Sequence, residues 1–201
     1  MNASFYRLLD RPVAYALVQH LLAPGAERII TRRITDMLAA VPEGEPLLDL
    51  GCGPTSWLSR VGLTPFGLDI NPAYVAAYRT LGSPCVVASA VQIPFRDDSF
   101  GGVWSVGLLH HLPDDLVRKI LYEAIRVSRG YVAILDAVTP AVGWRRPLAS
   151  TIRKLDRGKF MRSEQALEAL LPGRGRWDCR RFTYAATGLE MLSCIYQDNH
   201  A

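Results

Sequence analysis

Two carboxylates and a pair of glycines form the pattern in this chain that most clearly points to chemistry. Asp49 lies in a short apolar stretch, and the turn Gly51-Cys52-Gly53 follows it directly. A second acidic residue, Asp69, closes another apolar stretch 20 positions later. Glycine has no Cβ and lets a ligand approach the backbone closely, and a carboxylate accepts strong hydrogen bonds from ribose hydroxyls. The pattern predicts a site that holds the ribose end of a nucleoside cofactor.

Several other interpretations of this pattern are open. A dinucleotide site needs a third glycine in the pattern G-x-G-x-x-G, and Ser56 stands at that position. Pro54 removes an amide donor near the place where a pyrophosphate would bind. Both observations argue against NAD or FAD. A glycine pair after a strand can also form only a tight turn, and Asp69 can serve only to satisfy the free amides at a helix start.

The elements that must position these residues alternate between strands and helices. Helices are expected from about Thr55 or Ser56, after Asn71-Pro72, and after Pro113-Asp114. Strands are expected at 47–50, 65–70, 85–88, 102–109 and 131–135. This order predicts an α/β fold with a parallel sheet and right-handed crossovers.

The two ends of the chain differ from this alternating core. Residues 1–42 show helical periodicity, with one helix expected over 26–40. Near the other end, a short helix is expected from Ser163 to Leu171, and the runs 177–185 and 189–197 suit an antiparallel pair at the sheet edge. With 201 residues, the chain is interpreted as a single domain, 1–201.

Composition favours a globular protein of the cytoplasm. Hydrophobic residues make up 49% of the chain and charged residues 21%. The four cysteines form no CxxC pair and no Cys/His cluster, so neither a metal site nor a disulfide framework is expected. There is no secretory signal, and the apolar run 12–22 is too short to span a bilayer.

Positive charge is concentrated in one part of the chain. The net charge is +4, but residues 145–181 contain 11 Lys or Arg against four Asp or Glu. Such an excess is commonly a solvated basic face. The alternative is a surface that contacts an anionic partner, such as a phosphate-bearing substrate, a nucleic acid or an acidic lipid headgroup.

Four motifs in order resemble those of the class I S-adenosylmethionine-dependent methyltransferases, and the likeness is greatest to the bacterial branch that acts on small molecules, lipids and quinones. The matching segments are 48–54, 67–72, 88–95 with 98–100, and 103–112. The resemblance implies a Rossmann-like fold with a mostly parallel seven-stranded sheet, an antiparallel terminal strand pair and N-terminal helices. It divides the chain into a helical lid (1–42), a cofactor-binding core (45–138), and a substrate-side insertion with the terminal strand pair (139–201).

The resemblance also implies a cofactor, S-adenosylmethionine, with S-adenosylhomocysteine as product, and a set of residues that bind it. Those residues are Asp49, Gly51, Cys52, Gly53, Asp69, Ile70, Ser89, Ala90 and Val106. Three positions depart from the family pattern. Thr55 replaces the third glycine of the family's first motif. Ser89 in the third motif and Gly101 in the fourth stand where the family usually has acidic residues.

Methyl transfer needs a general base only when the acceptor arrives protonated. His111, which follows His110 after the fourth strand, is the first candidate because imidazole titrates near neutrality. Asp136 at the end of the fifth strand is the second candidate. The alternatives are that one histidine packs on the sheet while the other is solvated, and that Asp136 is a turn residue.

The predicted function is methyl transfer to a small-molecule or lipid-like acceptor, which the basic segment 145–181 suggests is anionic or sits at an anionic surface. The alternatives are an RNA methyltransferase and a non-catalytic partner subunit that keeps the fold. No aromatic-basic interleaving of the RNA-stacking kind stands out, so a nucleic-acid partner is not favoured.

Overall fold

The structure is a computed structural model of the 201-residue chain. It describes residues 26–39, 41, 44–139, 159–184 and 189–198. Most of the segment expected to form the N-terminal lid, 1–42, therefore lies outside the described residues, as do 140–158 of the basic segment.

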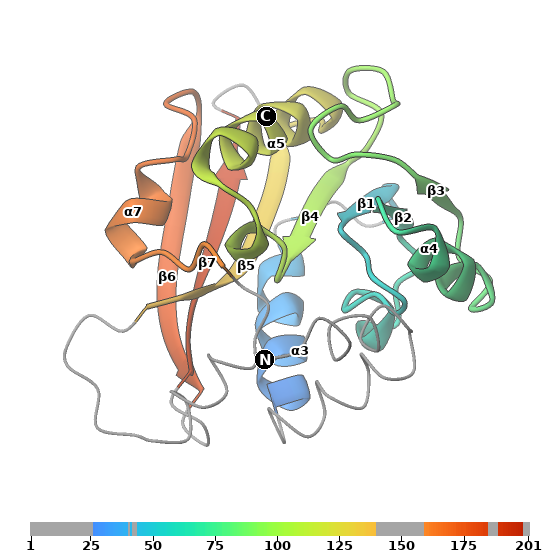
Figure 1. The fold of residues 1–201 in the computed structure, drawn as a ribbon, viewed down its shortest axis with the longest axis horizontal. Coiled ribbons are helices and arrows are strands. Elements are labelled where there is room, and N and C mark those ends of the chain that lie inside the picture. Colours follow the sequence, from blue (N-terminus) through green and yellow to red (C-terminus); the bar gives the residue numbers. More distant parts are fainter. Residues whose placement is uncertain (1–25, 40, 42–43, 140–158, 185–188, 199–201) are drawn as a thin grey trace.

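Seven strands form one sheet in the order β3-β2-β1-β4-β5-β7-β6, and they lie side by side in this order across Figure 1. The pairs from β3 to β5 are parallel, and β7 pairs antiparallel with both β5 and β6. The strands are β1 (Leu47–Leu50), β2 (Phe66–Asp69), β3 (Cys85–Val87), β4 (Gly102–Val106), β5 (Tyr131–Val138), β6 (Arg176–Tyr184) and β7 (Leu189–Gln197). The expected mostly parallel sheet with an antiparallel terminal pair is confirmed.

The order of the strands reverses beside β1, which lies between β2 and β4. Because β1 pairs in parallel with both neighbours, their carboxyl ends meet at one edge of the sheet. In Figure 1 this edge faces downward, where the arrow of β4 ends. Open α/β sheets bind ligands at such a switch point, so the topology brings Asp49 and Asp69 to the same edge.

Helices cover both faces of the sheet. α5 (Asp114–Val127) and α7 (Glu164–Glu168) contribute to one apolar cluster with buried residues of β1, β4, β5 and β7. On the opposite face, α3 (Ala26–Leu38) packs on β4 and β5, and the Tyr131 hydroxyl donates to the carbonyl of Met37 at 2.6 Å. α4 (Pro72–Arg79) is capped by Asn71, whose side chain accepts from the Ala73 amide at 2.9 Å.

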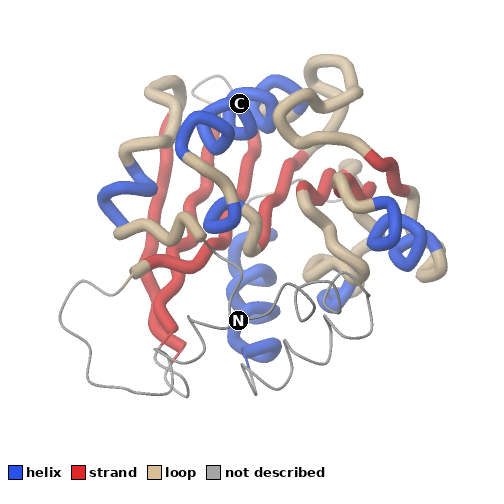
Figure 2. The backbone as a smooth tube through the Cα atoms, in the orientation of Figure 1, coloured by secondary structure: helices blue, strands red, loops and turns tan. Residues whose placement is uncertain are grey.

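The helix expected from Thr55 or Ser56 is absent from the structure, and this prediction was wrong. The stretch between β1 and β2 is a loop with one 3₁₀ turn, η1 (Ser59–Val61), which Figure 2 shows as a short helical segment within the loop. The Ser56 oxygen still accepts from the Leu58 amide at 3.0 Å, as a capping hydroxyl would, while its proton is donated to Asp49, but only this 3₁₀ turn follows. The glycine turn therefore has no α-helix N-terminus behind it, which is the element that dinucleotide sites use for a pyrophosphate.

The end of β4 also differs from the expected strand 102–109. β4 stops at Val106 because Gly107 adopts a left-handed φ of +70°, a conformation that glycine tolerates without steric cost. A 3₁₀ turn, η2 (Leu109–His111), follows. β5 is longer than expected and reaches Val138 through its pairing with β7.

The expectation that the cysteines form no disulfide was wrong for one pair. Cys179 of β6 and Cys194 of β7 are joined by a disulfide, with Cα atoms 4.1 Å apart. The two residues stand opposite each other in the antiparallel register of the terminal hairpin, and only this pairing brings them together. Cysteine spacing along the chain gives no signal of such a cross-strand contact.

Within the described ranges, no helix combines the length and the apolar character needed to cross a membrane.

Candidate functional site

The glycine turn after β1 has the backbone geometry that only glycine adopts easily. Gly51 and Gly53 have φ angles of +68° and +62°, and the Gly51 amide donates to the carbonyl of Leu68 at 2.7 Å. A Cβ on Gly51 would lie 2.8 Å from Cδ1 of Leu108, whereas a Cβ on Gly53 would meet nothing within 4 Å. Gly51 is thus required by close packing, and Gly53 leaves open space beside the turn.

Asp69 closes this turn from the neighbouring strand. Its Oδ2 accepts from the Gly53 amide at 3.0 Å and its Oδ1 from the Asn71 amide at 2.8 Å. Burial raises the pKa of the Asp69 carboxyl, and the hydrogen bonds from these amides oppose the rise. A carboxylate oxygen has two lone pairs, so each oxygen keeps capacity for one more donor.

Asp49 lies deeper, with 3% of its surface exposed. Its Oδ2 accepts from the Ser56 hydroxyl at 2.5 Å, and the Ser56 oxygen accepts in turn from the Leu58 amide at 3.0 Å. Burial raises the pKa of Asp49 to about 7; the Ser56 hydrogen bond opposes this rise and the charge of Asp69 adds to it. Two carboxylates whose fields overlap make this edge of the sheet electronegative.

Ile70 and the turn after β3 lie next to Asp69. Ile70 is 72% exposed, the most exposed of the large apolar side chains in the described residues. The Ala88 amide donates to the Asp69 carbonyl at 3.0 Å, which ties the start of the Ser89-Ala90 turn to the end of β2. The Ser89 hydroxyl accepts from the Val91 amide at 3.4 Å. An exposed apolar side chain, a hydroxyl and a carboxylate therefore border the same edge.

The remaining predicted cofactor residues, Cys52 and Val106, both have buried side chains. The Cys52 side chain is buried, and burial is the main reason that the pKa of its thiol is raised. Its Sγ lies where it would come within 2.8 Å of a Cβ on Gly67, which puts it against β2. Val106 is the last residue of β4 and is also buried.

Asp136 pairs with the imidazole of His110, whereas the sequence favoured His111 as the candidate base. Nδ1 of His110 lies 2.5 Å from Oδ1 of Asp136, and both side chains are buried. The other carboxylate oxygen of Asp136 accepts from the Leu109 amide at 2.6 Å. The His111 ring contacts that of His110 at a tilt of 42°, with ring centres 4.0 Å apart. Sequence reasoning could not tell which of the two histidines meets Asp136, because that depends on the direction in which the 3₁₀ turn points each side chain.

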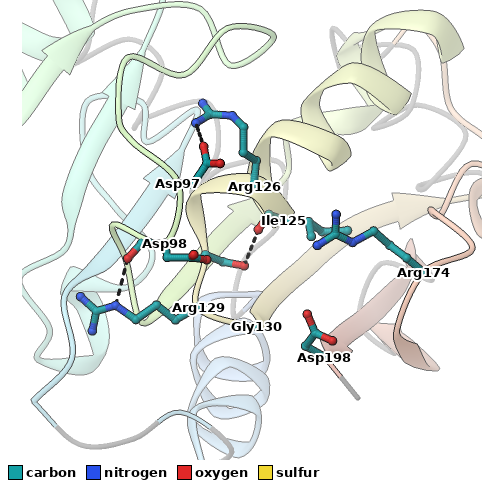
Figure 3. Close-up of a pocket in the computed structure, with 9 residues that line it drawn as sticks. Asp97, Asp98, Ile125, Arg126, Arg129, Gly130, Arg174 and Asp198 are labelled. Carbon is teal, nitrogen blue, oxygen red and sulfur yellow. Dashed lines mark hydrogen bonds and ion pairs between the residues drawn. The ribbon is translucent and has the colours of Figure 1, made fainter. Parts of the chain in front are cut away.

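A concave region lies at the opposite edge of the sheet, near the amino end of β5, and has a volume of about 560 Å³. It is lined by charged side chains of both signs, as Figure 3 shows: Asp97, Asp98, Arg126, Arg129, Arg174 and Asp198. The Arg126 guanidinium is already bonded to Glu123, Asp97 and two carbonyls. These groups hold the loop before β4 against α5, and they lie away from the glycine turn.

Two arginines of the basic segment are committed to internal contacts. Arg162 has an 8% exposed side chain and is paired with Asp114 at 2.7 Å. Arg181 is paired with Glu164 at 3.0 Å and with Glu190. Arg153 and Arg157, which were expected to serve the same surface, lie outside the described residues. Part of the positive charge is therefore neutralised within the fold. Among the residues whose positions are described, no cluster of three His, Cys, Asp or Glu side chains could hold a metal ion.

Comparisons with known proteins point to one family. A family model described as a methyltransferase domain matches residues 48–134, which run from β1 to the middle of β5. A methyltransferase, GfsG, from Streptomyces halstedii is 34% identical over 131 residues, which cover 58% of this chain and 46% of that protein. A demethylmenaquinone methyltransferase from Corynebacterium efficiens is 30% identical over 145 residues, which cover 70% of this chain and 60% of that protein.

A third relative is named for a different class of acceptor. It is a tRNA (carboxymethyluridine(34)-5-O)-methyltransferase from Arabidopsis thaliana, 32% identical over 109 residues, which cover 51% of this chain and 26% of that protein. The chain thus spans between about a quarter and 60% of the length of these relatives.

The fold has close counterparts among solved structures. An S-adenosylmethionine-dependent methyltransferase from Thermotoga maritima superposes with a TM-score of 0.71 at 16% identity, covering 96% of this chain and all of that one. Sequence motifs, strand order and these likenesses agree: residues 48–134 belong to the methyltransferase-domain family, and the sheet has the fold of S-adenosylmethionine-dependent methyltransferases.

Proposed function

We propose that the chain binds S-adenosylmethionine at the carboxyl edge of its sheet and transfers the methyl group to a small-molecule acceptor. The observation that carries the proposal is the joint geometry of the glycine turn. The carboxylate of Asp69 closes on the amide of Gly53 at 3.0 Å, beside space that a Cβ on Gly53 would enter without contact. A ligand can approach the backbone at that point and meet a carboxylate there.

The surrounding groups fit the parts of an adenosyl ligand. Asp69 would accept from the ribose hydroxyls with the lone pairs that its two amide partners leave unused. Ile70, 72% exposed, offers an apolar surface against which a purine ring would lie. Ser89 stands where a neutral hydroxyl would accept from the purine amine, without the charge that an acidic residue would bring.

The negative charge of this edge favours S-adenosylmethionine over a dinucleotide. The edge contains two carboxylates, and each has its pKa raised by burial. A cationic ligand relieves the cost of keeping these groups ionised, whereas a pyrophosphate would increase it. No α-helix begins behind the glycine turn to offset that repulsion. The site therefore favours a nucleoside that carries a positive charge.

When bound, S-adenosylmethionine supplies a methyl group made electrophilic by its sulfonium. The chain contributes orientation, exclusion of water and, for a protonated acceptor, a base. Well-oriented reactants can gain up to roughly 7–11 kcal/mol from positioning alone. His110 is the proposed base because it lies just past the end of β4, at the same edge of the sheet as the glycine turn.

Asp136 would hold the His110 imidazole in one tautomer and stabilise the imidazolium that forms. With the proton on Nδ1, which faces Oδ1 of Asp136 at 2.5 Å, Nε2 is the basic nitrogen of the neutral ring. The Leu109 amide holds the other oxygen of the carboxylate at 2.6 Å. His111, which the sequence favoured, then serves as a neighbour of the base rather than as the base.

The acceptor is proposed to be a small molecule of the quinol or related hydroxylated type. The support is the demethylmenaquinone methyltransferase, which is 30% identical over 145 residues. An anionic or lipid-like acceptor bound by the segment 145–181 remains a proposal with narrower support, because Arg162 and Arg181 are already paired inside the fold. An RNA acceptor is the alternative, and its support is the relative named as a tRNA methyltransferase.

Calorimetric titration with S-adenosylmethionine, S-adenosylhomocysteine and NAD tests the cofactor. We expect the two adenosyl ligands to bind in the micromolar range and NAD not to bind. Asp69→Asn should weaken adenosyl binding at least tenfold, since it replaces a charged acceptor by a neutral one. No adenosylmethionine binding at high micromolar concentration would overturn the proposal, and binding of NAD would favour an oxidoreductase.

Transfer from radiolabelled S-adenosylmethionine to a panel of reduced quinones and phenols, with bulk tRNA as the competing acceptor, tests the reaction. With an accepted quinol or phenol, His110→Gln should lower kcat by about 10²- to 10⁴-fold, the usual contribution of a general base. His111→Gln is the matched control and should change kcat little. Equal effects of the two substitutions would exclude His110 as the base. Radiolabel found in tRNA alone would overturn the small-molecule acceptor in favour of RNA.

A further inference from the structure

Arg162 is the most heavily bonded side chain near the proposed base. It lies just before α7, and its side chain is 8% exposed. Its guanidinium donates from Nη1 to the Leu109 carbonyl at 2.9 Å, from Nη2 to the Leu112 carbonyl at 2.5 Å, and from Nε to Asp114 Oδ1 at 2.8 Å. No sequence pattern singled out this role, because Arg162 counted only as one member of a basic segment.

The carbonyls that Arg162 contacts belong to the turn that carries His110. A helical turn ends with carbonyl groups that have no partner within the turn. In η2 (Leu109–His111) and the residue after it, the carbonyls of His110 and Leu112 accept from the Phe160 amide at 3.0 Å and from Arg162, respectively. The Leu109 carbonyl accepts from the Leu112 amide at 3.1 Å within the turn and takes Arg162 as a second donor. A segment about 50 residues later in the chain thus caps the end of this turn.

The backbone of Arg162 is joined to the strand that carries Asp136. The Thr139 amide donates to the Arg162 carbonyl at 2.7 Å, and Arg162 forms a parallel bridge with Val138 at the end of β5. One residue therefore contacts η2 through its side chain and β5 through its main chain, and these two elements supply the two members of the His110–Asp136 pair.

The peptide groups of Leu109 show how these contacts act together. Its amide donates to Asp136 at 2.6 Å, and its carbonyl accepts from Arg162 at 2.9 Å. The residue before His110 is thus held from both sides, which leaves the imidazole little freedom to leave the carboxylate. We infer that Arg162 is a positioning residue that fixes His110 against Asp136. Its importance for catalysis rests on the proposed function, but the geometric claim does not.

The ion pair with Asp114 explains why a charged group is tolerated in this position. Asp114 is 68% exposed on the first turn of α5, so it neutralises the guanidinium while remaining largely hydrated. The three-way contact needs the planar fork of arginine, which lysine cannot reproduce with a single ammonium. Lys at this position would keep the charge and lose most of the bonds to η2.

The test is the state of the His110 ring, observed by NMR long-range ¹H–¹⁵N correlation on the cofactor-free full chain with labelled histidine. His110→Gln assigns the signals. The native ring should show one tautomer with the proton on Nδ1, and Arg162→Lys should replace it by a mixture of tautomers or by exchange-broadened signals. The control is Arg180→Lys, at an arginine that is 68% exposed, and it should leave the ring signals unchanged.

An unchanged His110 spectrum in Arg162→Lys, in a protein whose thermal unfolding shows that it is folded, would overturn the inference. A loss of thermal stability without a change of tautomer would mean that Arg162 is only structural. The outcome is independent of the proposed function, because the ring is observed without cofactor or acceptor. Failure to bind S-adenosylmethionine would remove the proposed function and leave this geometric result intact.

Discussion

Asp49 makes a quantitative prediction about cofactor affinity. Its pKa is raised to about 7, mainly by burial, so the carboxylate is only partly ionised near neutral pH. If the proposed cofactor binds as a cation, it should favour the ionised form. The Asp49→Asn variant keeps an oxygen that can accept from Ser56 but does not titrate, so the two proteins should differ in affinity by an amount that depends on pH.

The size of the difference follows from the pKa. With a value of about 7, Asp49 is roughly one-tenth ionised at pH 6 and roughly nine-tenths ionised at pH 8. The ratio of the Kd of Asp49→Asn to that of the wild type should therefore rise by about tenfold between these pH values. Use of the ratio cancels titration of the ligand's own amino group, which lies close to this range.

Isothermal titration with S-adenosylmethionine at pH 6, 7 and 8 measures this ratio. Asp115→Asn, at an exposed residue of α5, is the charge-matched control, and its ratio to the wild type should stay constant with pH. A constant ratio for Asp49→Asn as well would refute the reasoning. It would mean either that Asp49 does not titrate in this range or that its charge does not reach the ligand.

Unfolding in urea gives an independent check on the same group. A carboxyl whose pKa is raised on folding binds more protons in the folded state, so it destabilises the fold as the pH rises above the unfolded value of 3.8 toward about 7. A shift of this size corresponds to up to about 4 kcal/mol. The free energy of unfolding of the wild type should therefore fall relative to that of Asp49→Asn between pH 5 and pH 8. The opposite trend would show that the pKa is lowered.

Three further changes test the scaffold. Gly51→Ala should lower the free energy of unfolding by about 1–3 kcal/mol, since it combines a left-handed φ with a close approach to Leu108; an unchanged urea midpoint would contradict the described turn. Cys179→Ser should cost about 3 kcal/mol under non-reducing conditions, because it opens a loop closed across 15 residues by the bond to Cys194; dithiothreitol should destabilise the wild type by a similar amount and leave the variant unaffected. Tyr131→Phe should cost about 1–2 kcal/mol by leaving a carbonyl of α3 without its donor, and thermal unfolding that matches the wild type would show that water replaces the hydroxyl.

The alternating part of the fold was accessible from sequence because each element carries its own signal. β1 and β7 have the predicted bounds, and α4 begins at the predicted Asn71 cap. The signal failed at Ser56, where a good helix-capping residue faces a buried carboxylate. Its hydroxyl donates to Asp49 at 2.5 Å while its oxygen accepts from the Leu58 amide at 3.0 Å, and only a 3₁₀ turn follows. Propensity describes what a residue can do locally and not which partner it meets in the fold.

In the candidate site, too, residues with a local sequence signal could be predicted and tertiary contacts could not. Asp49, Asp69 and the two glycines could be selected because strand ends and turns place them at one edge. The sequence favoured His111 as the base and gave no sign that His110 meets Asp136, since that contact depends on the orientation of a single 3₁₀ turn. The Cys179–Cys194 bond and the role of Arg162 were also beyond reach, because each depends on a register or a contact between segments distant in sequence.

The hydrogen bond between the Thr139 amide and the Arg162 carbonyl, at 2.7 Å, holds together the two ends of the intervening segment. Replacing the sequence within that segment should leave Thr139 and Arg162 in their present positions. The spacing between the imidazole of His110 and the carboxylate of Asp136 should therefore tolerate changes of sequence within 140–158, so that this interval and the paired side chains could diverge at separate rates.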